Sequence, residues 1–438
     1  MITTLPYITS ERPKALGVSK STIMVWTAIS LILVETFSGA LRFYLDAAGA
    51  SALMYLPKVL CLTLFALELA TLKIGRAFWL GLLLLTIYSV LGMLHGATLS
   101  NIGFALFIYS PLLFGMVCGV HLEHRKRLLG WVIGFCLVAS LLGILLDRFT
   151  AVPWKGYSYN LGETTLSGNT AWSASGTDRL AGFARMSTGA AMMIAIFSLY
   201  LGSFTRSRLV QAALYGTALA GIVLTTNKST AAAFVIALGM MMVASRPLLC
   251  RAIFFITVGM GIALPAASLL MNFDVHATTG DSSLASLYDR LVNTWPTVVK
   301  MIDQEGWSLF GAGFGMIGSS VALFPLFDVN VPYVTDNSAL YLWGAFGVLG
   351  LVMYALLMPL LTQLRDKPTF MSAALLGITF CITLISWTTD VLEVSVAALF
   401  LGLAVSHVLL RKAMPTQTAP ADLRETDRDN FPTAFKPL

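Results

Sequence analysis

Two arginines, Arg179 and Arg185, lie on either side of Gly182, shortly before a long apolar stretch. A guanidinium group remains charged and donates two parallel hydrogen bonds, which suits it to the oxygens of a phosphate. Arg290 and Lys300 lie in a second polar stretch further along the chain. If these cations converge, they predict an anionic binding site. Anchoring to lipid headgroups at a membrane surface is the alternative interpretation.

A carboxylate or an imidazole close to such a site would orient or deprotonate a hydroxyl group. Asp336 is the first candidate for this role, and Asn337 beside it is a candidate substrate contact. His276 is the second candidate for the proton acceptor, although a single histidine in a loop is also commonly a solvated surface residue.

Other charged residues lie at the edges of apolar stretches, where an unpaired charge is costly. Glu35, Arg42 and Lys58 are placed at similar depth in two neighbouring stretches. They predict an ion-pair cluster that either fixes helix packing or contributes to the site. Lys228 lies in a tight polar turn on the side opposite most basic residues, which favours a functional role.

Aromatic residues gather in the two polar stretches of the chain. Their faces suit the apolar faces of sugar rings, but an aromatic belt at a membrane interface has the same composition. Trp154 and Trp172 are the candidate sugar contacts. The other members are Tyr157, Tyr159, Tyr288, Trp295, Trp307 and Tyr333.

The composition indicates what must position these residues. Of 438 residues, 57% are hydrophobic and only 11% are charged, which predicts an integral membrane protein. The five cysteines fall in apolar runs without metal-ligand spacing, so we expect packing residues rather than disulfides or a zinc site. The net charge of +6 is too small and dispersed to indicate a nucleic-acid partner.

The hydropathy pattern predicts an all-α, polytopic fold with about twelve transmembrane helices, since each span needs about twenty apolar residues. The predicted spans are 22–41, 51–71, 76–95, 101–120, 127–147, 186–204, 208–226, 229–245, 251–271, 338–363, 371–389 and 392–410.

Basic residues in the short loops fall on one side when the spans alternate, which identifies that side as the cytoplasm. Residues 1–20 and a disordered tail, 412–438, are then both cytoplasmic, around one transmembrane domain, 21–411. Two larger loops, 148–185 and 272–337, lie together on the periplasmic side.

The second loop contains a predicted amphipathic helix, from Ser282 to Trp307. Its apolar stripe has steps of three and four residues, and its opposite face is polar. We expect this helix to lie along the membrane surface or over a cavity. A flexible turn, Gly311 to Gly315, follows it. The stripe consists of Leu284, Leu287, Leu291, Trp295, Val298 and Ile302, and the polar face of Ser286, Asp289, Asn293, Lys300 and Asp303, with Arg290 on the border.

At these residues the chain resembles the O-antigen polymerase and ligase family, the Wzy-type and WaaL-type membrane proteins. Four blocks carry the resemblance, in matching order and on one side of the membrane. They are Arg179 with Gly182-Phe183; Asn227-Lys228-Ser229; Arg290 through Trp295 to Gly311-x-Gly-x-Gly315; and Asp336-Asn337-x-x-Leu340 followed by Gly347-x-x-Gly350. The family's ligases typically carry His where this chain has Asp336. That difference favours a polymerase, as does the segment Phe37 to Arg42 ahead of Tyr55 to Lys58.

The resemblance implies a glycosyltransferase of the bacterial inner membrane that polymerises undecaprenyl-diphosphate-linked oligosaccharides into an exopolysaccharide or O-antigen. It implies no metal or other cofactor. Arg179, Arg185 and Arg290, with Lys228, would stabilise the departing diphosphate, while Arg42 and Lys58 would contact substrate. A chain-length regulator and a flippase are the implied protein partners.

Three other functions remain open from the sequence. A ligase would transfer finished polymer to lipid A-core. A secondary transporter or flippase for lipid-linked oligosaccharide would suit the number of spans, although such folds commonly carry repeats and broken helices. A structural membrane subunit would explain the scaffold but not the arginines.

Overall fold

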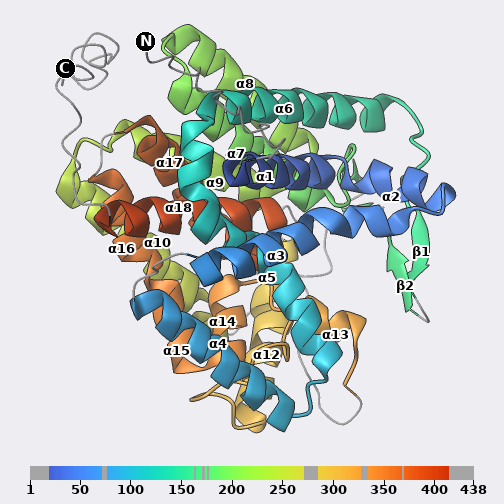
Figure 1. Ribbon diagram of the computed structural model, residues 1–438, viewed down its shortest axis with the longest axis vertical. Coiled ribbons are helices and arrows are strands. Elements are labelled where there is room, and N and C mark those ends of the chain that lie inside the picture. Colours follow the sequence, from blue (N-terminus) through green and yellow to red (C-terminus); the bar gives the residue numbers. More distant parts are fainter. Residues whose placement is uncertain are drawn as a thin grey trace, which may run out of the picture.

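The computed structural model describes residues 19–71, 76–161, 164–169, 173–174, 177–270, 285–326, 334–366 and 369–413. The chain is mostly helical (Figure 1). The first half contains α1 (Lys20–Thr36), α2 (Ser38–Ala47), η1 (Ser51–Tyr55), α3 (Leu56–Thr71), α4 (Arg76–Leu94), α5 (Leu99–His124), α6 (Lys126–Phe149), α7 (Ser187–Phe204) and α8 (Arg208–Leu224). The second half contains α9 (Lys228–Met242), α10 (Pro247–Leu270), α11 (Ala285–Asp289), the π-helical turn η3 (Arg290–Thr294), α12 (Trp295–Gln304), α13 (Ser319–Leu323), α14 (Ser338–Phe346), α15 (Val348–Ala355), α16 (Leu357–Arg365), α17 (Phe370–Ile385), η4 (Val391–Glu393) and α18 (Ser395–Ala413).

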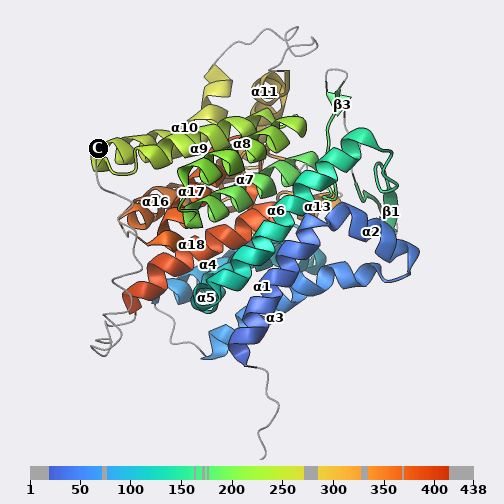
Figure 2. The same ribbon diagram turned by 90° about the horizontal axis from the view of Figure 1, so that it is seen from above.

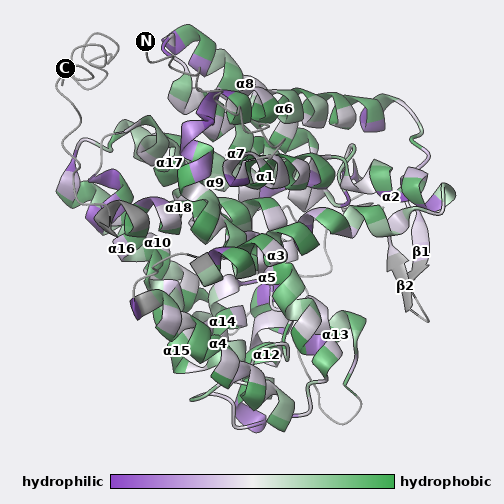
Figure 3. Ribbon diagram, viewed as in Figure 1, coloured by the Kyte–Doolittle hydropathy of each residue, from purple (hydrophilic) through white to green (hydrophobic). Residues whose placement is uncertain are grey.

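Six helical stretches of the described chain are long and apolar enough to cross a membrane, as expected of a membrane protein. They are Ser51–Ala70, Leu99–His124, Lys126–Phe149, Ser187–Phe204, Pro247–Leu270 and Val348–Arg365. Five shorter apolar helices accompany them, and Figure 3 shows hydrophobic residues along most of the helices in view. The predicted total of about twelve spans, their sidedness and both cytoplasmic termini remain predictions.

The first predicted span, 22–41, is wrong as a single straight helix. α1 ends at Thr36, and α2 leaves it at an angle of 87°. The break is held open by another part of the chain, because the carbonyl of Phe183 accepts the backbone N–H of Gly39 at 2.8 Å. A Cβ on Gly39 would lie 2.5 Å from the carbonyl oxygen of Ala184, so this close approach requires glycine.

The predicted span 338–363 is also divided. α14 ends at Phe346, and the next residue, Gly347, has a φ of +61°, which favours glycine. The helical stretch long enough to cross a membrane begins at Val348. Val348 donates its backbone N–H to the carbonyl of Leu309 at 3.0 Å. This contact ties the break to the loop that follows α12.

Buried residues form two main cores. The larger one surrounds α7 and α17, most of whose residues are buried, and includes α1, α5, α6 and α18. α9, α8, α7 and α6 are neighbours in that order (Figure 2). The smaller core joins the first half of α5 to α12 and α14, which lie in the lower part of Figure 1. The five cysteines are buried and unpaired by disulfides, as expected of packing residues.

The amphipathic helix of the second loop is present, as α11, η3 and α12, and its apolar stripe packs against other parts of the chain. Trp295, Val298 and Ile302 are buried in the smaller core, and Leu287 and Leu291 pack against it. The predicted polar face is exposed. The described part of the apolar stripe therefore covers protein.

The predicted flexible turn, Gly311 to Gly315, is instead a packed loop. Ala312 and Phe314 are buried, and their backbone N–H groups donate to Gly344 and Tyr88 at 2.7 and 2.8 Å. Three glycines have positive φ; a Cβ on Gly313 would lie 2.2 Å from the backbone nitrogen of Gly92. The glycines thus allow close packing, not flexibility.

The all-α prediction did not include strands, but the first loop contains two short antiparallel hairpins. They are β1 (Ser158–Leu161) with β2 (Thr164–Ser167), and β3 (Ser173–Ala174) with β4 (Thr177–Asp178). The β1–β2 hairpin lies beside α2 (Figures 1 and 2). The predicted cytoplasmic terminal segments lie almost wholly outside the described residues.

Candidate functional site

A cavity of about 900 Å³ gathers charged side chains from six parts of the chain. Seven of the residues predicted from the sequence line it, together with two further acidic residues. The basic members are Arg42, Lys58, Arg179, Arg185, Lys228 and Arg290, and the acidic members are Glu35, Asp336 and Glu393. The six cations outnumber the three carboxylates, so the cavity is suited to an anion.

The segment before α7 forms one wall, and its backbone is held from several directions. Asp147, near the end of α6, accepts the N–H groups of Ala181 and Gly182 at 3.0 and 3.2 Å. Gly182 has a φ of +60°, and a Cβ there would lie 2.7 Å from the backbone of Gly143. The glycine of the predicted Arg-x-x-Gly block is therefore required by packing. This packing fixes the backbone positions from which the side chains of Arg179 and Arg185 project.

Arg179 and Arg185 differ in their partners. Arg185 donates from Nε to the carbonyl of Ser167 at 3.1 Å, and its backbone N–H donates to Ser38 at 3.0 Å, beside the α1–α2 break. Burial and the neighbouring Arg42 lower the pKa of Arg185. Nε of Arg179 is buried and has no hydrogen-bond partner among the residues that the structure describes. Both cations are thus poorly neutralised by protein groups.

The predicted cluster of Glu35, Arg42 and Lys58 forms only in part. Lys58 pairs with Glu35 at 3.2 Å. Because the helix breaks at Phe37, Arg42 is directed elsewhere: it donates to the hydroxyl of Tyr159 in the β1–β2 hairpin and lies 5.3 Å from the centre of that ring. All three side chains line the cavity, so the cluster is part of the site.

Arg290 and Asp336, from the two ends of the second loop, meet directly. Nε of Arg290 donates to Oδ2 of Asp336 at 3.0 Å, while Nη1 donates to the carbonyl and hydroxyl oxygens of Ser286 at 3.1 and 2.7 Å. Arg290 begins the π-helical turn, in which the N–H of Trp295 donates to the carbonyl of Arg290, five residues back. Pro296 follows and has no N–H, which favours this wider turn.

Asp336 has an unusual backbone and an unusual acidity. Its φ is +49°, in the left-handed region that few non-glycine residues adopt. Burial raises the pKa of Asp336, although Arg290 opposes this shift. A carboxylate with a raised pKa, held by a cation at the edge of a cavity, is suited to accept a proton.

Lys228 reaches the cavity from the start of α9. Asn227 caps this helix, its side chain accepting the N–H of Thr230 at 3.0 Å. Thr226, just before, has a φ of +60°. Thr226 and Asp336 are the two non-glycine residues with positive φ in the described chain, and both line the cavity. Backbone strain of this kind is concentrated at functional sites.

Two predicted substrate contacts have structural roles instead. Trp154 is buried and donates its indole N–H to the carbonyl of Gly182 at 2.8 Å. Asn337 is fully buried and caps α14: its Oδ1 accepts the N–H of Leu340 at 2.8 Å, while its amide donates to two carbonyls. An asparagine just before an apolar helix is a capping signal, and that signal was available in the sequence.

The remaining predictions are placed as follows. Trp172 and His276 lie outside the described residues. Lys300 is exposed on the polar face of α12 and does not line the cavity.

The sequence interpretation missed Glu393 as a cavity residue. Its Oε1 accepts the N–H of Ser319 at 2.9 Å, and its Oε2 accepts the hydroxyl of Ser319. Burial raises the pKa of Glu393. Nearby Asp390 has its pKa raised to about 7 by burial and by Glu393. Two acidic residues in the turn between the last apolar stretches were the available signal.

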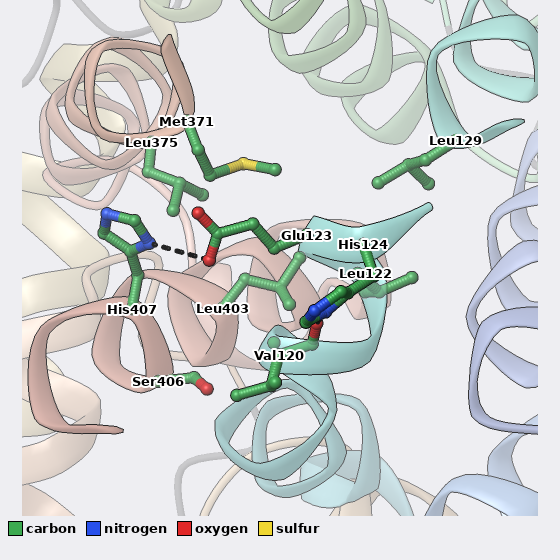
Figure 4. Close-up of a pocket in the computed structure, with 11 residues that line it drawn as sticks. Val120, Leu122, Glu123, His124, Leu129, Met371, Leu375, Leu403, Ser406 and His407 are labelled. Atoms are coloured by element: carbon green, nitrogen blue, oxygen red, sulfur yellow. Dashed lines mark hydrogen bonds and ion pairs between the residues drawn. The ribbon is translucent and has the colours of Figure 1, made fainter. Parts of the chain in front are cut away.

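A second, smaller cavity of about 160 Å³ lies where α5 ends and α17 begins. Figure 4 shows His407 facing Glu123 across it, with Nδ1 at 3.9 Å from the carboxylate. Nε2 of His407 lies 2.8 Å from the hydroxyl of Ser372. Apart from Glu123, His124, Ser406 and His407, its lining is apolar, and none of the predicted site residues reaches it.

No protein-family model and no curated protein sequence matches this chain.

Proposed function

We propose that this protein is a polysaccharide polymerase of the bacterial inner membrane. It would transfer a growing chain from undecaprenyl diphosphate to a hydroxyl of an incoming lipid-linked repeat unit, on the periplasmic side. The observation that carries the proposal is the convergence of six cations on one 900 Å³ cavity in an apolar, helical protein. A lipid diphosphate matches both features. Its anionic group suits the six cations, and its lipid tail suits an apolar protein.

The reaction needs two kinds of assistance, and residues suited to each line the cavity. Negative charge develops on the departing diphosphate, so cations fixed beforehand around it lower the barrier. Arg179 and Arg185 on one wall and Arg290 on another would supply this charge. The attacking hydroxyl must lose its proton, and Asp336 is the carboxylate at hand. The glycosidic bond to the diphosphate breaks as the bond to the acceptor oxygen forms.

The direct test replaces Arg179, Arg290 or Asp336 by alanine in a strain lacking its own polymerase. We expect each variant to make single repeat units in place of long polymer, at an unchanged level of protein in the membrane. Arg251, exposed at the start of α10, provides the matched control Arg251→Ala. Polymer of normal length from all three site variants would refute this function.

The broken helix formed by α1 and α2 favours a second candidate, a transporter or flippase of the same lipid-linked oligosaccharide. Transporters place substrate beside interrupted helices, and the 87° break borders the cavity at Ser38 and Arg42. Deletion separates the two functions. Loss of a polymerase leaves single repeat units on the outer side of the membrane, whereas loss of a flippase leaves none there.

A further inference from the structure

We infer that Asp390 is a positioning residue: it holds Asp336 in its left-handed turn, with the Asp336 carboxylate against Arg290 and at the cavity. This role rests on the function proposed above, and it belongs to a residue that does not itself line the cavity.

The first support is that Asp390 binds the residues on both sides of Asp336. Its Oδ1 accepts the hydroxyl of Thr335 at 2.5 Å and the N–H of Asn337 at 3.2 Å, while Oδ2 is 3.4 Å from the N–H of Thr335. Asp336 is therefore the middle residue of a three-residue turn whose flanking donors converge on one carboxyl group.

The second support is the conformation of that middle residue. A φ of +49° is unfavourable for a residue with a Cβ, so the surrounding structure must impose it. The following residues are fixed to the same turn: Ser338 donates its N–H to Ser386 at 2.9 Å and its hydroxyl to Thr389 at 2.8 Å. In the run 335–338, only Asp336 faces the cavity.

Simple capping does not explain this arrangement. Asn337 already caps α14 with its own side chain, and its amide already binds Gly261 and Trp387. The contacts of Asp390 add nothing to the ladder of α14. Their effect is on the backbone before the helix, where they determine the direction of Asp336.

The structural test measures hydrogen exchange at pH 8 in the full-length protein in detergent. In Asp390→Asn, one of the two acceptor oxygens becomes an amide group that donates, so at least one of the backbone N–H groups of Thr335 and Asn337 loses its acceptor. We expect that N–H group to exchange at least tenfold faster. Peptides from α7 should be unchanged, and the control Asp303→Asn, exposed on α12, should change neither region. Unchanged exchange at residues 335–337 would overturn the inference, whether or not the protein is a polymerase.

The functional test asks whether Asp390 acts through Asp336. We expect Asp390→Asn to lower kcat for chain extension at least tenfold and leave KM within twofold, because the cations that bind diphosphate remain. In the Asp336→Ala background the same change should cost no further activity. Thr335→Val keeps the shape of the side chain and should show a smaller loss with the same dependence on Asp336. A further loss of tenfold or more in the Asp336→Ala background would show a general structural role instead. If the wild type makes no polymer, the proposed function fails, and hydrogen exchange still decides the positioning role.

Discussion

Replacement of Arg290 by lysine keeps the positive charge of this residue and removes its geometry. The guanidinium group uses two nitrogens in different directions: Nε binds Asp336 at 3.0 Å, while Nη1 binds both oxygens of Ser286 at 3.1 and 2.7 Å. A lysine ammonium is a single point and cannot occupy both places. The variant therefore loses either the contact with the helix or the contact with Asp336.

The magnitude follows from these contacts and their exposure. A hydrogen bond to a charged group contributes roughly 1.5–3 kcal/mol, but the side chains of Arg290 and Asp336 are 20% and 33% exposed, and solvent weakens the interaction. Losing the charged bond to Asp336, or both bonds to Ser286 at about 1 kcal/mol each, therefore costs ~2 kcal/mol. If this loss falls on the transition state, extension slows about 30-fold, since 1.36 kcal/mol corresponds to a factor of ten.

The assay is the rate of polymer extension by purified protein supplied with a lipid-linked repeat unit, with Arg251→Lys as the control for an exposed arginine. The level of protein in the membrane should match that of the wild type. An Arg290→Lys rate within twofold of the wild-type rate would show that the positive charge alone suffices and that the geometry of the guanidinium group is not required.

Three other predictions follow from the same structure. Because Arg290 opposes the burial that raises the pKa of Asp336, Arg290→Gln should raise this pKa further; if the ionised carboxylate is the base, the acid limb of the pH–rate profile moves to higher pH. Glu393→Gln can accept only one of the two hydrogen bonds from Ser319, so extension should slow about tenfold, corresponding to ~1.4 kcal/mol. In Gly402→Ala, the new Cβ would lie 2.2 Å from the carbonyl of Leu112, so thermal unfolding in detergent should show a loss of about 1–3 kcal/mol. Gly239→Ala, where nothing lies within 4 Å, should instead be neutral or stabilising by up to ~1 kcal/mol.

Some cavity residues could be predicted from their side-chain chemistry and from the side of the membrane assigned to their loops. Arg179, Arg185 and Arg290 are residues suited to phosphate in loops assigned to one side, and the structure brings them to one cavity. Glu393 was not predicted as a cavity residue, because the residues around it in the sequence do not indicate that the last interhelical turn contacts Ser319. That proximity is a result of tertiary packing.

The broken first helix shows a different limit. The stretch 22–41 has the length and hydropathy of a straight span and contains no proline. The break arises because Gly39 leaves room for the backbone of Phe183 and Ala184, some 145 residues away in the chain. Local propensity cannot show such an insertion. It nevertheless decides the site, because it brings Arg185 beside Ser38 and separates Arg42 from Glu35.

The charge balance of the cavity argues for a ligand that carries its own negative charge. Of the three carboxylates in the lining, Glu35 is paired with Lys58, Asp336 with Arg290, and Glu393 accepts two hydrogen bonds from Ser319. None is left to neutralise Arg179, whose Nε is buried without a partner among the described residues, or Arg185, whose pKa is lowered by burial and Arg42. Concentrating like charges in this way costs folding free energy, which an anion recovers on binding. A neutral sugar or lipid would recover none of it. In the proposed reaction, the same excess of positive charge would hold the diphosphate more tightly as its negative charge grows, which is the condition for accelerating its departure.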